Sequence, residues 1–327
     1  MKKLIQLILL IMSLAYSQGG IVSGFISDSS SGEALIGANV MIQETGQGMA
    51  TDINGYYIIQ NINPGSYTLM VSYVGFSVSR NQIIISSEES VKKNIEMVED
   101  LVQLTQVDVT AEKLQRRNNI QPSKINLSPR MMKAAPALAE PDLFRTIQAL
   151  PGVLTTSEYS TGLVIRGGNT DQNLIMLDGI TVYNPSHLGG VFSNFIVDGV
   201  KEAELIKGAY NAEYGGRLSA VLNVISREGN QKEFKGKANI SLLSAQTTLE
   251  GPFYKGAWIL SGRRTYFDLV LPKVLPDNIA TNIPPYFFYD VQGHVFSDIS
   301  SKDRFSISYY TGIDDILFDT FGLDGRW

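Results

Sequence analysis

The sequences LVIRGG at residues 163–168 and QNLIMLDGITV at residues 172–182 lie in the middle of the 327-residue chain. The longer stretch predicts a β-hairpin, because Asp178-Gly179 stands at the turn between two apolar runs. Arg166 followed by two glycines suggests a phosphate cradle, but no helix start with Lys-Ser or Lys-Thr follows, which excludes a P-loop. The two stretches therefore predict short strands joined by glycine-containing turns.

The segments around this hairpin extend the pattern. Residues 142–150 predict a short helix that begins after Pro141 and ends at Pro151-Gly152. Its apolar face consists of Leu143, Phe144, Ile147 and Leu150. The later motifs are VKEAELIKG at residues 200–208, AEYGGR at 212–217 and SAVLNVIS at 219–226, of which the last predicts a strand. Each of these motifs is unspecific when it is taken alone.

Taken in order, the motifs resemble the plug domain of TonB-dependent outer-membrane receptors. That family shows an Ile-Arg-Gly strand, a Leu-Asp-Gly hairpin, a Glu-x-Ile-x-Gly turn, a Tyr-Gly step and a final strand that contains Asn-Val. The match extends from about Gln121 to Arg227, and residues 121–229 are called the plug segment below. The resemblance implies an α+β plug domain that lies inside a transmembrane β-barrel.

The linker ahead of the plug segment, residues 98–120, contains a short β-prone motif. Val107 and Val109 alternate with polar residues, so this segment is competent to join another sheet as an edge strand. By itself it reads as an interdomain linker. The resemblance implies more, namely a TonB box that TonB captures with the help of its inner-membrane energising complex. The implied box consists of Gln106, Val107, Asp108, Val109, Thr110 and Ala111.

The resemblance also implies a lock between the plug and the barrel. Family members hold the plug through basic plug residues that face barrel carboxylates. Arg166 matches one such position, and Lys207 stands where many relatives have arginine. Lysine lacks the planar fork of arginine, which weakens any bidentate pairing at that second position.

Residues 18–97 predict a small β-sandwich, because short β-rich segments alternate with turn residues. Asn54-Gly55 predicts a type I′ hairpin turn, since both turn positions of that type need positive φ. The expected strands are 21–27, 38–43, 56–60, 66–74, 82–86 and 91–97. The motifs at residues 24–28, 32–40, 51–57 and 64–69 resemble the carboxypeptidase-regulatory-like domain. This resemblance implies a seven-stranded prealbumin-like sandwich without catalytic residues.

Residues 230–327 alternate apolar with polar side chains, which is typical of the first strands of a transmembrane β-barrel. Each strand alone is a weak signal, since soluble antiparallel sheets alternate too. The aromatic run at residues 286–289 suggests an interfacial girdle. The aspartates Asp314, Asp315, Asp319 and Asp324 predict a solvated extracellular loop rather than a calcium site. A plugged transporter has about 22 strands, so we expect the chain to be the N-terminal part of a longer receptor.

The N-terminus and the composition fix the expected compartment. Lys2 and Lys3 precede an apolar run and a small-x-small site, which predicts a signal peptide at residues 1–17. The chain has no cysteine, which excludes disulfides, thiolate metal sites and lipidation of a cysteine. A net charge of −5 excludes a strongly basic nucleic-acid binder. His187 and His294 lack a second metal ligand at standard spacing, so we expect structural roles, no metal and no cofactor.

Together these features predict a mainly β, non-enzymatic receptor in the bacterial outer membrane, with the sandwich in the periplasm. It would import a small-molecule, glycan or peptide ligand in contact with outer-membrane lipid. Two other hypotheses stay open at this point. One is a secreted or surface adhesin built of soluble β domains, which would need no detergent. The other is an exported peptidase, which the name of the first domain suggests and which predicts hydrolysis.

Overall fold

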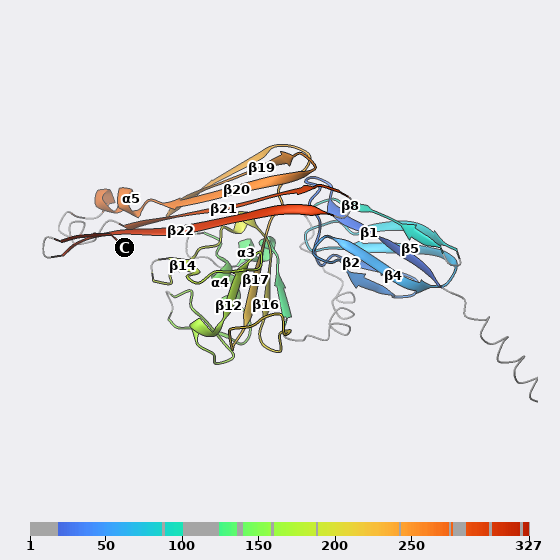
Figure 1. Cartoon of the computed structure of the whole chain (residues 1–327), viewed down its shortest axis with the longest axis horizontal. Coiled ribbons are helices and arrows are strands. Elements are labelled where there is room, and N and C mark those ends of the chain that lie inside the picture. Colours follow the sequence, from blue (N-terminus) through green and yellow to red (C-terminus); the bar gives the residue numbers. More distant parts are fainter. Residues whose placement is uncertain are drawn as a thin grey trace, which may run out of the picture. The chain divides into compact units, whose positions relative to one another are not determined.

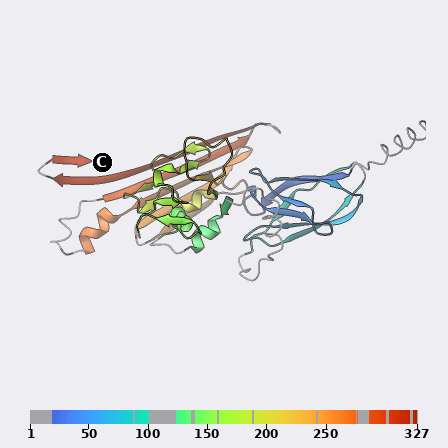
Figure 2. The same ribbon diagram turned by 90° about the horizontal axis from the view of Figure 1, so that it is seen from below.

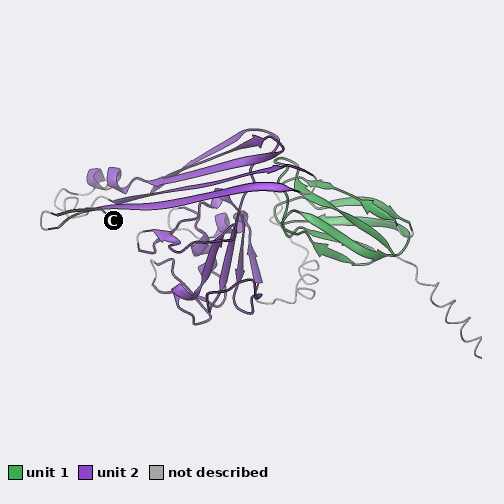
Figure 3. Ribbon diagram, in the orientation of Figure 1, with its two compact units in different colours: residues 1–120 green, residues 121–327 purple. Residues whose placement is uncertain are grey.

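A computed structural model describes residues 19–86, 89–100, 124–135, 140–157, 160–187, 189–241, 243–274, 276, 286–300, 303–320 and 323–326. The predicted signal peptide and the predicted TonB box lie outside these residues. The chain divides into two compact units, residues 1–120 and 121–327, which Figure 3 shows in two colours. Each unit is described by itself.

The first unit is a β-sandwich, as predicted. In one sheet β1 (Gly20–Asp28) pairs with β4 (Tyr56–Ile62), β7 (Ser90–Lys92) and β8 (Ile95–Met97). The other sheet has the order β3 (Gly48–Ala50), β2 (Asn39–Ile42), β5 (Gly65–Ser72) and β6 (Ser79–Ile85). Its core side chains are aliphatic apart from Tyr57 and include Val22, Ile26, Val40, Leu69 and Ile83.

The sandwich differs from the prediction at two strands. β3 lies between the expected strands 38–43 and 56–60, where the sequence predicted no strand. The expected strand 91–97 is divided into β7 and β8, which both run parallel to β1. Between β7 and β8, the Lys93 carbonyl oxygen lies only 2.0 Å from where a Cβ of Gly24 would be. Only glycine at position 24 permits this close approach.

The prediction of a type I′ hairpin at Asn54-Gly55 is wrong. Among these two residues only Gly55 has positive φ, at 74°. The Asp52 carboxylate accepts hydrogen bonds from the backbone N–H of Asn54 and of Tyr56, both at 2.8 Å. This aspartate therefore fixes a different turn, and the turn joins β3 to β4, which belong to different sheets.

The plug segment contains a five-stranded mixed sheet in the order β13-β12-β17-β16-β9. Its strands are β9 (Lys124–Leu127), β12 (Leu174–Leu177), β13 (Ile180–Thr181), β16 (Val200–Ile206) and β17 (Val221–Ser226). The predicted hairpin is present, with Leu177 opposite Ile180. Asp178 and Gly179 have φ values of 50° and 81°, so both turn positions are left-handed as a type I′ turn requires.

Two smaller sheets and short helices cover this sheet. β10 (Val153–Thr155) pairs with β11 (Leu163–Ile165), and β14 (Ser186–His187) pairs with β15 (Phe192–Ser193). The predicted helix 142–150 is α4 (Leu143–Gln148), and three residues of its expected apolar face are buried. An additional helix, α3 (Pro129–Ala134), precedes it. Among the helices of the described residues, none is both long and apolar enough to cross a bilayer.

The rest of the second unit is an antiparallel sheet of six strands in chain order, called the outer sheet here. It consists of β18 (Lys235–Ile240), β19 (Ser244–Phe253), β20 (Gly256–Thr265), β21 (Tyr286–Asp298), β22 (Arg304–Thr320) and β23 (Leu323–Arg326). The short helix α5 (Phe267–Val274) lies between β20 and β21. Figures 1 and 2 show the plug segment on one face of this sheet. In the described residues the edge strands β18 and β23 do not pair, so the barrel is incomplete.

Two expectations about the outer sheet need correction. The four aspartates at 314, 315, 319 and 324 lie in β22 and β23 rather than in a loop. The aromatic run 286–289 alternates across β21. Tyr286 and Phe288 are buried against Phe192 of the plug segment, so only the other two residues of the run are on the outer side.

Candidate functional site: the interface between the plug segment and the outer sheet

The outer sheet has two chemically opposite faces. On β20 the side chains of Ala257, Ile259, Ser261, Arg263 and Thr265 are buried toward the plug segment. The opposite face carries exposed apolar side chains, as the alternation predicted. They are Ile240, Leu260, Phe305, Ile307, Tyr309 and Ile313, with exposed fractions between 42% and 84%. Charge is thus buried on the inner face while apolar surface is exposed on the outer face.

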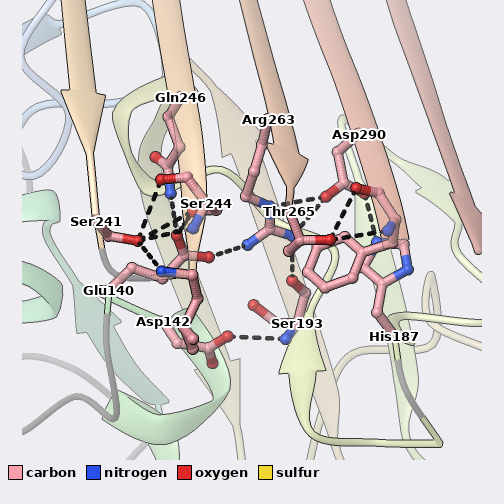
Figure 4. A network of polar contacts seen from close by, with 12 residues as sticks. Glu140, Asp142, His187, Ser193, Ser241, Ser244, Gln246, Arg263, Thr265 and Asp290 are labelled. Atoms are coloured by element: carbon pink, nitrogen blue, oxygen red, sulfur yellow. Dashed lines mark hydrogen bonds and ion pairs between the residues drawn. The ribbon is translucent and has the colours of Figure 1, made fainter. Parts of the chain in front are cut away.

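Arg263 is the centre of the inner face, and its side chain is buried. Its Nε and Nη2 donate to Asp290 Oδ2 at 2.8 and 2.5 Å, and its Nη1 donates to Glu140 Oε1 at 2.8 Å. Nη2 also donates to the Ser193 carbonyl oxygen at 2.6 Å. Figure 4 shows that one guanidinium joins two strands of the outer sheet to strand β15 and to the segment that carries Glu140 in the plug segment. A buried charge is tolerated when it is paired and hydrogen-bonded in this way.

The plug contributes two carboxylates that the start of α4 positions. Asp142 is the N-cap of this helix and accepts from the Arg145 backbone N–H at 3.0 Å. Its second oxygen accepts from the Ser193 N–H at 2.8 Å, which ties the helix to β15. Glu140 lies two residues earlier, and its Oε2 accepts from Ser244 Oγ and from Gln246 Nε2 on β19. The cap geometry therefore aims Glu140 at the outer sheet.

His187 on β14 extends the charge network toward β22. Its Nε2 lies 2.6 Å from Asp290 Oδ1, and its Nδ1 lies 2.8 Å from Asp314 Oδ2. The imidazole is 1% exposed and stacks on the Phe288 ring, with centroids 4.1 Å apart. Burial alone would lower the pKa of His187, but the hydrogen bonds and charges of the two aspartates outweigh burial and raise this pKa.

A second cluster joins the plug segment to the first strand of the outer sheet. The Asp198 carboxylate accepts from Lys133 Nζ at 2.5 Å, from Lys237 Nζ at 2.8 Å and from Asn239 Nδ2 at 2.8 Å. Burial by itself raises the pKa of Asp198, yet the two ammonium groups outweigh it and hold the pKa below its ordinary value. The carboxylate is therefore ionised and bridges α3 and β18.

Some buried polar groups of this unit lack a hydrogen-bond partner. Glu202 on β16 is 6% exposed and its Oε2 accepts from no donor, so burial raises its pKa to about 7. Asn194 Oδ1 and the Tyr310 hydroxyl are also unpaired. The last two line a cavity of about 410 Å³ between the β12–β13 hairpin and β22. On the Arg263 side, Ser193 Oγ and Gln292 Oε1 also lack a hydrogen-bond partner.

Arg166 and Lys207, which the sequence predicted as lock residues, are not among the residues of the Arg263, His187 and Asp198 contacts. Lys207 Nζ donates to the Pro151 carbonyl oxygen at 2.7 Å, which is a contact within the plug segment. Arg166 is exposed, has a φ of 49°, and follows β11. Their assignment as a lock stays a prediction, as does the TonB box at 106–111. Among the described residues, no group of three His, Asp or Glu side chains is arranged to hold a metal ion.

Sequence reasoning missed Glu140, Arg263 and Asp290 as interface residues. A signal was present for two of them, because Arg263 and Asp290 occupy polar positions in alternating strands and barrel interiors are polar. No comparable signal marks Glu140, which lies next to Pro141 outside any periodic pattern.

Comparisons with known families agree with this architecture. Residues 22–109 match the CarboxypepD_reg-like domain, and residues 98–221 match the TonB-dependent Receptor Plug Domain. These matches cover the sandwich and most of the plug segment.

Individual relatives match at low identity. The TonB-dependent transporter Oar of Myxococcus xanthus is 24% identical over 241 residues, which are 70% of this chain and 22% of that protein. The TonB-dependent receptor P26 of Formosa agariphila is 28% identical over 224 residues, which are 64% of this chain and 21% of that protein. The chain thus spans about a fifth of the length of these curated relatives.

Solved structures of similar proteins include two from Pseudomonas aeruginosa. A mutant of the ferric enterobactin receptor PfeA has a TM-score of 0.44 at 19% identity, covering 62% of this chain and 34% of its own. The siderophore receptor PirA has a TM-score of 0.43 at 18% identity, covering 60% of this chain and 34% of its own.

Proposed function

The chain belongs to the TonB-dependent receptor family, whose plug domain it carries behind a carboxypeptidase-regulatory-like domain, and on this premise we propose energy-coupled import across the outer membrane. In this proposal the plug segment closes the transport path through the outer sheet and its barrel. Binding of TonB to residues 106–111 and the resulting pull loosen the plug. The family is one of outer-membrane proteins, and the sandwich would lie on the periplasmic side.

The observation that carries the proposal is the inverted polarity of the outer sheet. Soluble proteins place paired or solvated charges outside and apolar side chains inside. Here Arg263 and Asp290 are buried on the inner face, whereas Phe305, Ile307 and Tyr309 are more than half exposed on the outer face. A transmembrane β-barrel has this arrangement, because its outer surface contacts lipid and its interior is polar.

The polar contact with the plug segment supports a plug that can be loosened. One cluster around Arg263 and His187, which share Asp290, and a second cluster around Asp198 join the plug segment to the outer sheet. Such charged and polar groups can be solvated by water when the plug moves, whereas exposure of an apolar interface of the same size would be opposed by the hydrophobic effect. The hydrophobic core of the plug segment lies mostly among its own strands and helices, and its apolar contacts with the outer sheet involve Tyr310, Tyr286 and Phe288.

The proposal requires that TonB binds residues 106–111 of the linker. Val107 and Val109 alternate with polar residues, as an added edge strand would. Strand addition obtains its affinity from main-chain hydrogen bonds. Arg166 and Lys207 remain candidates for further plug contacts. The transported ligand is not assigned by these residues.

The experiment measures binding of the soluble C-terminal domain of TonB to the purified full-length receptor. Deletion of residues 106–111 is expected to abolish binding, as is replacement of Val107 and Val109 by proline, which removes two main-chain donors. The matched controls are deletion of residues 113–118 and replacement of the two valines by isoleucine, and both should bind normally. Unchanged binding after the first deletion would contradict the assignment of the box. A full-length product that stays soluble without detergent would instead favour an adhesin.

A further inference from the structure

His187 lies between two carboxylates that belong to different strands of the outer sheet. Asp290 on β21 faces its Nε2 at 2.6 Å, and Asp314 on β22 faces its Nδ1 at 2.8 Å. The histidine itself belongs to β14 of the plug segment. A single imidazole therefore joins the plug segment to two adjacent strands of the outer sheet.

The contacts of the two carboxylates leave one oxygen of each for the imidazole. Asp290 Oδ2 accepts from Arg263, and its Oδ1 faces His187. Asp314 Oδ1 accepts from the Tyr286 hydroxyl, and its Oδ2 faces His187. An ionised carboxylate accepts at both oxygens, so two ionised aspartates would present one acceptor to each nitrogen of the ring.

The protonation state of the imidazole follows from this count. A neutral imidazole has one N–H and one nitrogen lone pair, whereas the imidazolium ion has two N–H donors. A neutral His187 would place its lone pair against a carboxylate oxygen at hydrogen-bond distance. Only the imidazolium ion donates to Asp290 and Asp314 at the same time.

The remaining neighbours of the imidazole favour the same state. Phe288 stacks on one face of the ring, and Gly312 Cα lies close enough that a Cβ there would be 3.2 Å from the ring. Arg263 is a second cation of this cluster, and it pairs with Glu140 and Asp290. Tyr310 of β22 also faces the cluster. Without the imidazolium, Glu140 and Asp290 would share the charge of one guanidinium.

We propose that His187 is a doubly protonated latch between the plug segment and the outer sheet, and that loss of one of its protons as the pH rises loosens the plug segment. The inference rests on the proposed function only in taking plug release as the gating step. It adds a regulated contact that is independent of the linker.

The direction of the effect follows from proton linkage. While the plug segment contacts the outer sheet, the pKa of His187 is above its ordinary value of 6.5, and when the plug segment is released the imidazole returns to water. The latch is therefore complete at pH values below 6.5 and is lost as the pH rises through the raised value. Between these two values the equilibrium constant for release increases by up to about tenfold per pH unit.

The test is hydrogen–deuterium exchange of the purified full-length receptor at pH 6 and at pH 9, corrected for the intrinsic exchange rate at each pH. Peptides that cover residues 186–193 report opening of β14 and β15. We expect their protection in the wild type to fall at pH 9. His187→Gln should give the low protection at both pH values. Equal protection of the wild type at the two pH values would overturn the latch.

Two further variants separate a latch from a merely structural histidine. In Asp314→Asn the side-chain amide can donate to Nδ1, so a neutral His187 is satisfied. This variant should keep high protection at both pH values, and a retained pH dependence would contradict the proposal. The control is His294→Gln, because His294 is the other histidine of the chain and its Nδ1 contacts Ser308 Oγ at 2.9 Å. It should keep the wild-type pH dependence. Since no TonB is present, the result is independent of the test of the box.

Discussion

The sandwich and the interface of the plug segment with the outer sheet are built from the same alternating strands in opposite ways. In the sandwich, alternate residues of β1 such as Val22 and Ile26 are buried between two sheets, and the residues between them, which include Ser23 and Phe25, are more exposed. In β20 and β21 the buried alternate residues include Arg263, Asp290 and Gln292, while Leu260 is 44% exposed. A period of two therefore specifies that a strand has two faces, but not which face is apolar.

The difference shows what stabilises each region. The sandwich depends on the burial of aliphatic side chains, which is non-directional and tolerates exchange among similar shapes. The interface depends on charges whose partners must stay in place, because an unpaired buried charge is costly. Paired charges suit a region that must open in a cycle, whereas buried aliphatic side chains suit a module that stays folded.

The largest effect is expected from Arg263→Met, which leaves Glu140 and Asp290 without their shared cation. We expect plug opening to become easier by about 3–5 kcal/mol, because one partner of a buried ion pair is removed. Hydrogen exchange of peptides from α4 and β15 measures this opening. The matched control is Arg304→Met at the partly exposed pair with Asp298, where a loss of about 1 kcal/mol or less is expected. If both variants lowered the free energy of plug opening by similar amounts, the buried charges around Arg263 would not stabilise the interface more than an exposed pair does.

A smaller effect is expected from Leu69→Ala in the sandwich, where Leu69 is fully buried in the core. Truncation should cost about 3 kcal/mol of sandwich stability through lost burial and a cavity. Exchange of β5 peptides should accelerate, while exchange of the plug peptides in the same sample stays constant. Ile84→Ala is the control, since Ile84 is 73% exposed and its loss should change stability by less than about 0.5 kcal/mol. A matching acceleration in the plug segment would show that the two regions are not independent.

The smallest effect is a gain, expected from Glu202→Gln in the plug segment. Burial raises the pKa of Glu202 to about 7 from an ordinary value of 4.5, so stability falls as the pH rises from 4.5 to about 7 and stays reduced above it. The glutamine variant should therefore stabilise the plug segment at pH 8 by at most about 3 kcal/mol, less the cost of burying its own amide, and have little effect at pH 4.5. Urea unfolding at the two pH values measures the difference. Glu204→Gln on the same strand removes the ion pair with Lys124 and should give no such gain.

Much of the fold could be predicted because its signals are local. The Asp178-Gly179 turn, the capped helix α4 and the alternation of β20 to β22 each follow from neighbouring residues. The errors have one local and two distant causes. Asp52 sets the turn at Gly55 through hydrogen bonds to backbone groups two and four residues along the chain. The close approach of Lys93 to Gly24 lies between β7 and β8, and pairing with β21 places Asp314 in a strand.

The sequence by itself determined the order of the segments, the strand periodicity and the resemblance to a plugged receptor, since these depend on residues close together in the chain. Only the tertiary structure decided which charges meet. Glu140 and Arg263 are separated by 123 residues, and His187 and Asp290 by 103. No local preference brings such groups together, because their pairing depends on which face of the outer sheet receives the plug segment. Burial then makes each pair obligatory, since neither partner is stable there alone.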